Sequence, residues 1–193
     1  MISRDRSELF RIIVFVSFVF FTASFSYSGD SDLFKVSSPA IQHQGELPIE
    51  YTCDGGSSSP PVEWTGVPKG TKSFALSLWH DARLIKNKSY WVIYNIQADV
   101  RGIPKNAKRI GVDGYNEKGL TGYDPMCSSA GGVRIYNITV FALSEELKFD
   151  TEKVKIADLL PAMEGKILAK DTLTYTFTRS KDQKEKSKSS GKP

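Results

Sequence analysis

The chain has 193 residues, of which 40% are hydrophobic and 25% charged, and its formal net charge is +4. Residues 179–193 hold a net +4 and residues 1–28 a net +1, which leaves −1 for residues 29–178. A central segment of that length fits one domain with a sizeable core, and its near neutrality excludes the basic face that nucleic-acid binding requires.

The first 28 residues have the composition of a secretory signal peptide. Three arginines precede an almost wholly apolar run, 12–21, and small residues recur between 23 and 28. The alternative is a retained membrane anchor, but the apolar run is shorter than the ~20 residues that a spanning helix needs. We therefore expect cleavage after Ser26 or Ser28 and a periplasmic or secreted mature protein.

The chain contains two cysteines, Cys53 and Cys127, so each has one candidate partner. In an oxidising compartment we expect them to form a disulfide, and the alternative is a pair of buried, reduced thiols. Closing so long a loop would stabilise the fold by roughly 4 kcal/mol through the entropy of the unfolded chain.

Four segments have the alternation or the continuous apolar character of long strands: 73–79, 90–96, 135–143 and 172–178. In the first, Phe74, Leu76 and Leu78 share one face while Trp79 lies on the other. Shorter strands are expected at 33–36, 50–52 and 62–64. This mainly β pattern predicts a β-sandwich.

One helix is expected before the last strand, because five apolar residues recur there at helical spacing: Ile156, Leu159, Leu160, Met163 and Ile167. Asp158 is its expected cap, and Pro161 is compatible with a helix if it lies in the first turn.

Two segments lack the periodicity of a strand or a helix. The connection 102–132 is rich in glycine, so we expect it to wrap a site or a sheet edge. Residues 179–193 have no apolar side chain and are expected to be a disordered basic tail.

The stretch 51–64 carries the most specific motif of the chain: Cys53, Asp54 and Gly55, then Ser59, Pro60 and Pro61, then Trp64. This run resembles the signature of the phosphatidylethanolamine-binding protein family, in its bacterial Raf-kinase-inhibitor-like branch. The likeness extends from about residue 34 to 177, with further landmarks at Gly122, Tyr123, Asp124 and Cys127. It implies a β-sandwich with one helix in the C-terminal half, short peripheral helices and a small pocket for phosphate-like groups.

The family's pocket is built from an Asp-Pro-Asp-Ala-Pro loop, a histidine that opens the next strand and a Gly-X-His-Arg-Tyr segment. In this chain Trp79 replaces the first aspartate and Asp81 keeps the second. The strand-opening histidine becomes Tyr90, the later histidine becomes Arg134, and Tyr136 is retained. The resemblance therefore implies a diverged pocket formed by these five residues.

Two interpretations of that pocket remain open. Arg134 offers a permanently charged planar fork, the tyrosines offer hydroxyl groups, and Trp79 adds apolar surface, which favours an anionic, phospholipid-headgroup or amphiphilic ligand. Alternatively, Trp79 fills the cavity and Arg134 pairs with Asp81. The chain would then be a protein-interaction module, like the family members that inhibit kinases or proteases.

Catalysis is not expected. His80 and Asp81 are adjacent in a strand and point to opposite faces, so the carboxylate cannot orient the imidazole as a catalytic triad requires. Members of the family are not generally enzymes. Two histidines and two paired cysteines also give no set of ligands for a structural metal, and no cofactor is expected.

Overall fold

The computed structural model describes residues 33–81, 88–128, 131–182, 185 and 189, all within one compact unit that spans residues 31–193. The expected signal peptide lies outside the described residues. The elements are β1 (Lys35–Ser37), a 3-10 helix (Ile49–Tyr51), β2 (Val62–Thr65), β3 (Ser73–His80), β4 (Lys88–Gln97), β5 (Gly102–Ile103), β6 (Val112–Asp113), β7 (Val133–Leu143), α1 (Ile156–Ala162) and β8 (Ile167–Thr178). None of the described helices has the length and apolarity to cross a membrane.

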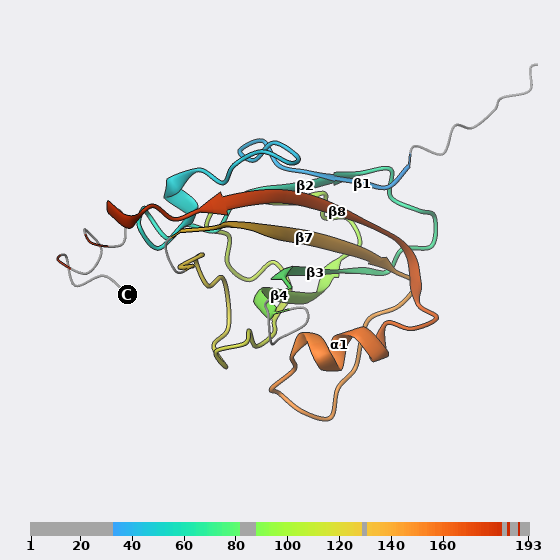
Figure 1. The fold of residues 1–193 in the computed structure, drawn as a ribbon. Coiled ribbons are helices and arrows are strands. Elements are labelled where there is room, and N and C mark those ends of the chain that lie inside the picture. Colours follow the sequence, from blue (N-terminus) through green and yellow to red (C-terminus); the bar gives the residue numbers. More distant parts are fainter. Residues whose placement is uncertain (1–32, 82–87, 129–130, 183–184, 186–188, 190–193) are drawn as a thin grey trace, which may run out of the picture. The chain divides into compact units, whose positions relative to one another are not determined.

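The strands form two antiparallel sheets, one of five strands in the order β6-β4-β3-β7-β8 and one of three in the order β1-β2-β5. Figure 1 shows the small sheet and α1 on opposite sides of the large sheet. The fold is therefore mainly β, a sandwich with one helix, as the sequence predicts.

The large sheet has a core on each face, because successive residues of its strands point to opposite sides. Phe74 of β3 packs toward the small sheet, with its ring centroid 5.1 Å from that of Trp64 in β2. Ala75, the next residue, belongs to the opposite core, where it clusters with Ile156 and Leu159 of α1. We call these two surfaces of the large sheet the inner face, toward the small sheet, and the outer face, toward α1.

The four long strands predicted from the sequence are confirmed, each somewhat longer than predicted, and so are the short strands at β1 and β2. The strand predicted at 50–52 is wrong, because this segment closes a 3-10 turn. The backbone N–H of Thr52 and its hydroxyl both donate to the carbonyl of Ile49, at 3.0 and 2.8 Å.

The helix is shorter than the apolar spacing predicts. Ile167 is not helical but opens β8, where it pairs with Leu143. Gly165, with φ of +73°, lies in the left-handed region and reverses the chain between helix and strand.

The cap and the proline also differ from expectation. Asp158 is not the cap residue but lies three positions after it, where its carboxylate accepts the backbone N–H of Lys155 at 2.9 Å. Pro161 lies in the second turn. It is tolerated there because the helix ends one residue later and the carbonyl left without a donor belongs to the exposed residue Ala157.

The glycine-rich connection 102–132 wraps sheet edges, in agreement with one of its two expected roles. Its first strand, β5, pairs with β2 at the edge of the small sheet. Its second, β6, pairs with β4 at the edge of the large sheet. The connection then returns along the start of β4, where the backbone N–H of Asp124 donates to the carbonyl of Tyr90 at 2.8 Å.

Candidate functional site

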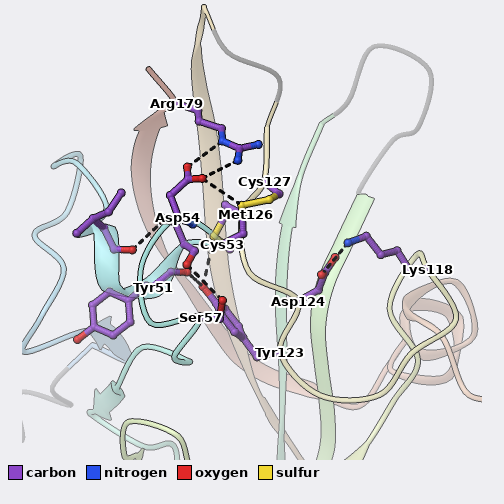
Figure 2. The surroundings of a disulfide bond; sticks show 12 residues. Tyr51, Cys53, Asp54, Ser57, Lys118, Tyr123, Asp124, Met126, Cys127 and Arg179 are labelled. Atoms are coloured by element: carbon purple, nitrogen blue, oxygen red, sulfur yellow. Dashed lines mark hydrogen bonds and ion pairs between the residues drawn. A yellow bond between two sulfur atoms is a disulfide. The ribbon is translucent and has the colours of Figure 1, made fainter. Parts of the chain in front are cut away.

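The Cys-Asp-Gly loop is tied to the segment that precedes β7. Cys53 and Cys127 form the predicted disulfide, which joins residues 74 positions apart with a Cα–Cα distance of 5.5 Å. Next to it, the backbone N–H of Cys53 donates to the carbonyl of Met126 at 3.3 Å, and the Tyr123 hydroxyl donates to the carbonyl of Tyr51. Figure 2 shows these contacts around the disulfide. Together they fix segment 123–127 against the rest of the domain.

Asp54 adds a third connection, to the end of the chain. Its carboxylate accepts two hydrogen bonds from the Arg179 guanidinium, at 2.8 and 2.6 Å (Figure 2). The side chains are only 5% and 8% exposed, so this is a buried ion pair. Arg179, which the sequence assigns to the basic tail, therefore belongs to the folded domain.

Three aromatic side chains meet on the inner face at one end of the large sheet. His80 is the last residue of β3, Tyr90 lies near the start of β4 and Tyr136 near the start of β7. Their ring centroids are 5.4 Å apart for His80 and Tyr90, 5.0 Å for His80 and Tyr136, and 5.6 Å for the two tyrosines. We call this group the strand-end cluster. Tyr175 of β8 stacks against Tyr136 at 5.8 Å and closes it from the core side.

Trp79 does not join the cluster. Its register partner in β7 is Asn137, and it points to the outer face, where its indole N–H donates to the Thr139 hydroxyl at 3.1 Å. The structure thus brings together Tyr90 and Tyr136 of the predicted set and places His80 beside them. The alternation that puts Leu78 inward also puts His80 inward, so the sequence contained the signal for this residue.

Arg134 and Asp81 lie beside the cluster in a pocket of about 380 Å³, which we call the strand-end pocket. Its lining residues come from the end of β3 and the start of β7: Trp79, His80, Asp81, Val133, Arg134, Ile135 and Asn137. Arg134 is half-buried and Asp81 is exposed. The pocket lies where the end of β3 and the start of β7 run side by side. His80 lines it and also belongs to the strand-end cluster.

The electrostatics of the cluster are those of a neutral group beside cations. Burial lowers the pKa of His80, and the nearby charges of Lys88 and Arg134 lower it further. Burial also raises the pKa of Tyr90 and of Tyr136. At pH 7 the three rings are therefore neutral, while Arg134 carries a positive charge and the Lys88 ammonium lies 5.6 Å from the ring centroid of Tyr90.

Within the described part of the chain, two polar atoms of the cluster have an unused hydrogen-bonding capacity, the Tyr136 hydroxyl and Nδ1 of His80. Nδ1 of His80 is buried and has no hydrogen-bond partner among the residues that the structure describes. A buried polar atom of this kind is costly unless a ligand or water satisfies it. The described residues contain no group of three His, Cys, Asp or Glu side chains that could hold a metal ion.

A second polar pocket, of about 630 Å³, contains none of the predicted site residues. Lys108 and Arg109 give it positive charge and Asp113 faces them. Burial raises the pKa of Asp113, although this residue is exposed. This pocket is a competitor for anions that any binding experiment has to control.

The fold and the strand-end pocket together define a β-sandwich protein with a small polar site at one end of its large sheet. The family model described as phosphatidylethanolamine-binding protein matches residues 37–178, and the chain belongs to this family. A UPF0098 protein of Methanothermobacter thermautotrophicus is 36% identical over 151 residues, covering 75% of this chain and 99% of the relative. The UPF0098 protein YbcL of Escherichia coli is 32% identical over 139 residues, covering 64% of this chain and 76% of that protein.

Solved structures agree. A phosphatidylethanolamine-binding protein homologue from Chlamydia trachomatis superposes with a TM-score of 0.72 at 29% identity, covering 77% of this chain and 99% of that one. The crystal structure of Escherichia coli YbcL gives a TM-score of 0.70 at 28% identity, covering 76% and 99%. The family and the bacterial branch inferred from the motifs are confirmed, and the family is generally one of binding proteins.

Proposed function

We propose that the chain is an exported, non-enzymatic binding protein that holds a small phosphate-like anion in the strand-end pocket. The observation that carries the proposal is the placement of the Arg134 guanidinium in one pocket with His80, whose buried Nδ1 has no partner among the described residues. Guanidinium groups bind phosphate and carboxylate through a planar fork of N–H donors. An imidazole can supply a further hydrogen bond and, when protonated, a further charge.

The tyrosines suit the same ligand. Tyr90 and Tyr136 remain protonated because burial raises the pKa of both hydroxyls, so each keeps its hydrogen-bond donor beside His80, although neither residue lines the pocket itself. The Lys88 ammonium, above the Tyr90 ring, adds positive potential at the same edge of the sheet. An amphiphilic ligand, such as a phospholipid headgroup, would place its apolar part against the exposed side chains of Val133 and Ile135 at the pocket rim.

The absence of catalysis is part of the proposal. A triad histidine donates Nδ1–H to an orienting carboxylate while its other nitrogen faces the nucleophile. The neighbours of the His80 ring are the rings of Tyr90 and Tyr136, and no described carboxylate accepts from its Nδ1. Export is supported by the apolar N-terminal run and by the disulfide, since disulfides persist mainly in oxidising compartments.

Titration calorimetry with inorganic phosphate, sulfate and phosphoethanolamine tests the binding. Arg134→Gln should lower the affinity for each anion by about tenfold or more, which is the effect of losing a charge-assisted contact. Lys108→Gln, in the larger pocket, is the matched control and should bind as the native protein does. Loss of binding in Lys108→Gln with full binding in Arg134→Gln would move the anion site to the other pocket and contradict the proposal.

The location is tested separately, by expressing the full chain in a Gram-negative host and determining the N-terminus of the protein recovered from the periplasm. We expect a mature protein that begins at residue 27 or 29. A full-length protein recovered only from the cytoplasm would contradict export and leave the binding result intact.

A second candidate function, as a protein-interaction or inhibitory module, is supported by the same rim. Val133 and Ile135 are 68% and 58% exposed and flank the pocket. Exposed apolar side chains that cluster on one edge are typical of protein contact surfaces. A partner recovered with the native protein but not with the Val133→Ser/Ile135→Ser variant, combined with no measurable anion binding, would favour this function.

A further inference from the structure

A separate pocket of about 220 Å³ lies on the outer face, between the large sheet and α1. Its lining residues come from three neighbouring strands and the helix: Ser77, Trp79, Thr139, Phe141, Lys170, Thr172, Ile156 and Leu160. The strand-end cluster lies on the inner face and this cavity on the outer face, although Trp79 lines both this cavity and the pocket that holds Arg134. We call this second cavity the outer-face pocket.

The floor of the outer-face pocket contains a hydroxyl group with no partner. Ser77 is 2% exposed, and its Oγ has no hydrogen-bond partner among the described residues. The neighbouring hydroxyls differ, because Thr139 accepts from the Trp79 indole at 3.1 Å and bonds the Thr172 hydroxyl at 2.9 Å. Ser77 is thus the lining hydroxyl left to satisfy, and it faces the cavity.

The walls are apolar and the rim is cationic. Trp79 is held in place by its indole hydrogen bond, and Phe141, Ile156 and Leu160 complete the apolar lining. Lys170 makes no ion pair with any carboxylate in the described part of the chain and is exposed.

Ser77 and Lys170 lie on opposite sides of the pocket. The register pairs Ser77 with Thr139 of β7, and Thr139 with Thr172 of β8, while Lys170 lies two residues before Thr172. Adjacent strands are about 4.8 Å apart, so Ser77 and the strand that carries Lys170 are separated by roughly 10 Å. A small aromatic ring with polar groups at both ends has this length.

We propose that the outer-face pocket binds a small aromatic acid that carries a polar substituent at the end of the ring opposite its carboxylate. The ring lies between Trp79, Phe141 and Leu160, the substituent hydrogen-bonds Oγ of Ser77, and the carboxylate pairs with Nζ of Lys170. The site does not depend on the anion site proposed above, because no residue with an unmet polar atom is shared between the two.

Three probes separate the elements of this proposal: 4-hydroxyphenylacetate, phenylacetate, which lacks the hydroxyl, and 4-hydroxyphenylacetamide, which lacks the charge. Binding is followed by the indole N–H resonance of Trp79 in nitrogen-15 spectra, assigned with Trp79→Phe. Trp64, which is 1% exposed, serves as the internal reference, and Trp91, which lines the larger polar pocket, reports any binding of the acids there. We expect the first probe to bind most tightly, with each of the others weaker by about 3- to 10-fold, the value of one polar contact.

Matched variants test the two polar contacts. Ser77→Ala should lower the affinity for 4-hydroxyphenylacetate to that for phenylacetate and leave the affinity for phenylacetate unchanged. Lys170→Gln should lower the affinity for both acids and leave the affinity for the amide unchanged. If both variants retain native affinities, or if the amide binds as tightly as the acid, the proposal is overturned.

A third variant tests the location. Leu160 is 38% exposed, so Leu160→Trp is expected to fold and to fill the cavity, which should abolish the shift of the Trp79 resonance. Leu120→Trp, at a position 59% exposed and outside the pocket, is the control and should bind normally. An unchanged shift in Leu160→Trp would also overturn the proposal. The same holds if no probe shifts the Trp79 resonance at about 10 mM, because even ligands this small are expected to bind at that concentration.

Discussion

At the scale of single residues, Arg179 shows how a charge beyond the last strand becomes structural. Its guanidinium reaches back to Asp54 in the Cys-Asp-Gly loop and is buried there. Removing one partner of a buried ion pair leaves the other charge desolvated and uncompensated. We therefore expect Arg179→Ala to lower the free energy of unfolding by about 3 kcal/mol or more.

Urea denaturation measures this effect, and Lys166→Ala is the control. Lys166 pairs with Glu145 at 2.8 Å, but the two side chains are 34% and 55% exposed, so its removal should change the free energy of unfolding by less than about 1 kcal/mol. Equal effects of the two substitutions would show that the Asp54 pair is not the buried contact described above.

We expect His80 to make the affinity of the proposed anion site depend on pH. Burial, together with the charges of Lys88 and Arg134, lowers its pKa below the ordinary value of about 6.5, so the imidazole is neutral at pH 7. As the pH falls below 7, the His80 imidazole binds protons more readily in the unfolded chain than in the native protein, so the free energy of unfolding falls. An anion bound in the proposed site would favour the protonated imidazole and raise the pKa of His80.

It follows that sulfate, which keeps its charge across this range, should bind more tightly as the pH falls from 7.5 to 5.5, by up to about tenfold per pH unit for one coupled proton. Calorimetry at each pH measures the affinity, and a nitrogen-15 or proton titration of the imidazole measures the pKa directly. His80→Gln should remove the dependence. A sulfate affinity that is independent of pH in the native protein would contradict a role for His80 in the site.

The residues of the site were only partly predictable from the sequence. Tyr90 and Tyr136 could be placed by motif, because each stands at a fixed offset in a well-defined strand. Trp79 was matched to a pocket position by motif although strand alternation placed it on the other face; in the structure its indole bonds Thr139 on the outer face, and the residue also lines the pocket that holds Asp81 and Arg134. The burial that shifts the pKa of His80 depends on packing among three strands, which no local pattern reveals.

At the scale of elements, the Cys-Asp-Gly loop depends on the absence of a side chain at Gly55. A Cβ atom placed there would lie 2.0 Å from the carbonyl oxygen of Ile49, which belongs to the backbone of the 3-10 helix and cannot rotate away. Gly55→Ala should therefore lower the free energy of unfolding by about 3 kcal/mol or more through overpacking.

Gly132→Ala is the control for that substitution, because a Cβ at Gly132 would meet no atom within 4 Å. Thermal and urea denaturation of the two variants should differ clearly, with Gly132→Ala close to the native protein. A native-like Gly55→Ala would mean that the loop can move away from Ile49, and the motif would then require glycine for some reason other than space.

The element boundaries explain why the sequence predicted long strands better than short elements. β3, β4, β7 and β8 are buried over many residues, so their patterns are long enough to be distinctive. The turn at 49–51 is three residues long, and its apolar residues Ile49 and Tyr51 alternate as a strand would. Ile167 has helical spacing from Met163, but Gly165 ends that periodicity between them.

At the scale of the whole domain, both proposed binding sites lie on the large sheet. Its inner face carries the strand-end cluster and its outer face carries the pocket beside α1. Adjacent residues of β3 contribute to them: His80 lines the pocket that holds Arg134, and Trp79 lines both pockets. A change in this strand that shifts the register by one residue would exchange the two and destroy both sites.

The disulfide connects the Cys-Asp-Gly loop to the segment before β7, 74 residues later in the sequence. It joins Cys53, before β2, to Cys127, before β7, and so closes a loop that contains β2 to β6. Its main contribution is to restrict the unfolded chain, and for a loop of this length it should stabilise the domain by about 4 kcal/mol. The variant Cys53→Ala/Cys127→Ala should therefore lose about that much stability relative to the oxidised protein.

Urea denaturation with and without dithiothreitol measures this contribution. The native protein should lose stability on reduction and approach the double variant, while the double variant should not respond to the reductant. Anion binding should survive in the folded double variant, because Arg134 and His80 are held by β7 and β3 rather than by the disulfide. Loss of anion binding in a double variant that is still folded would show instead that segment 123–127, which the disulfide fixes beside Tyr90, forms part of the ligand site.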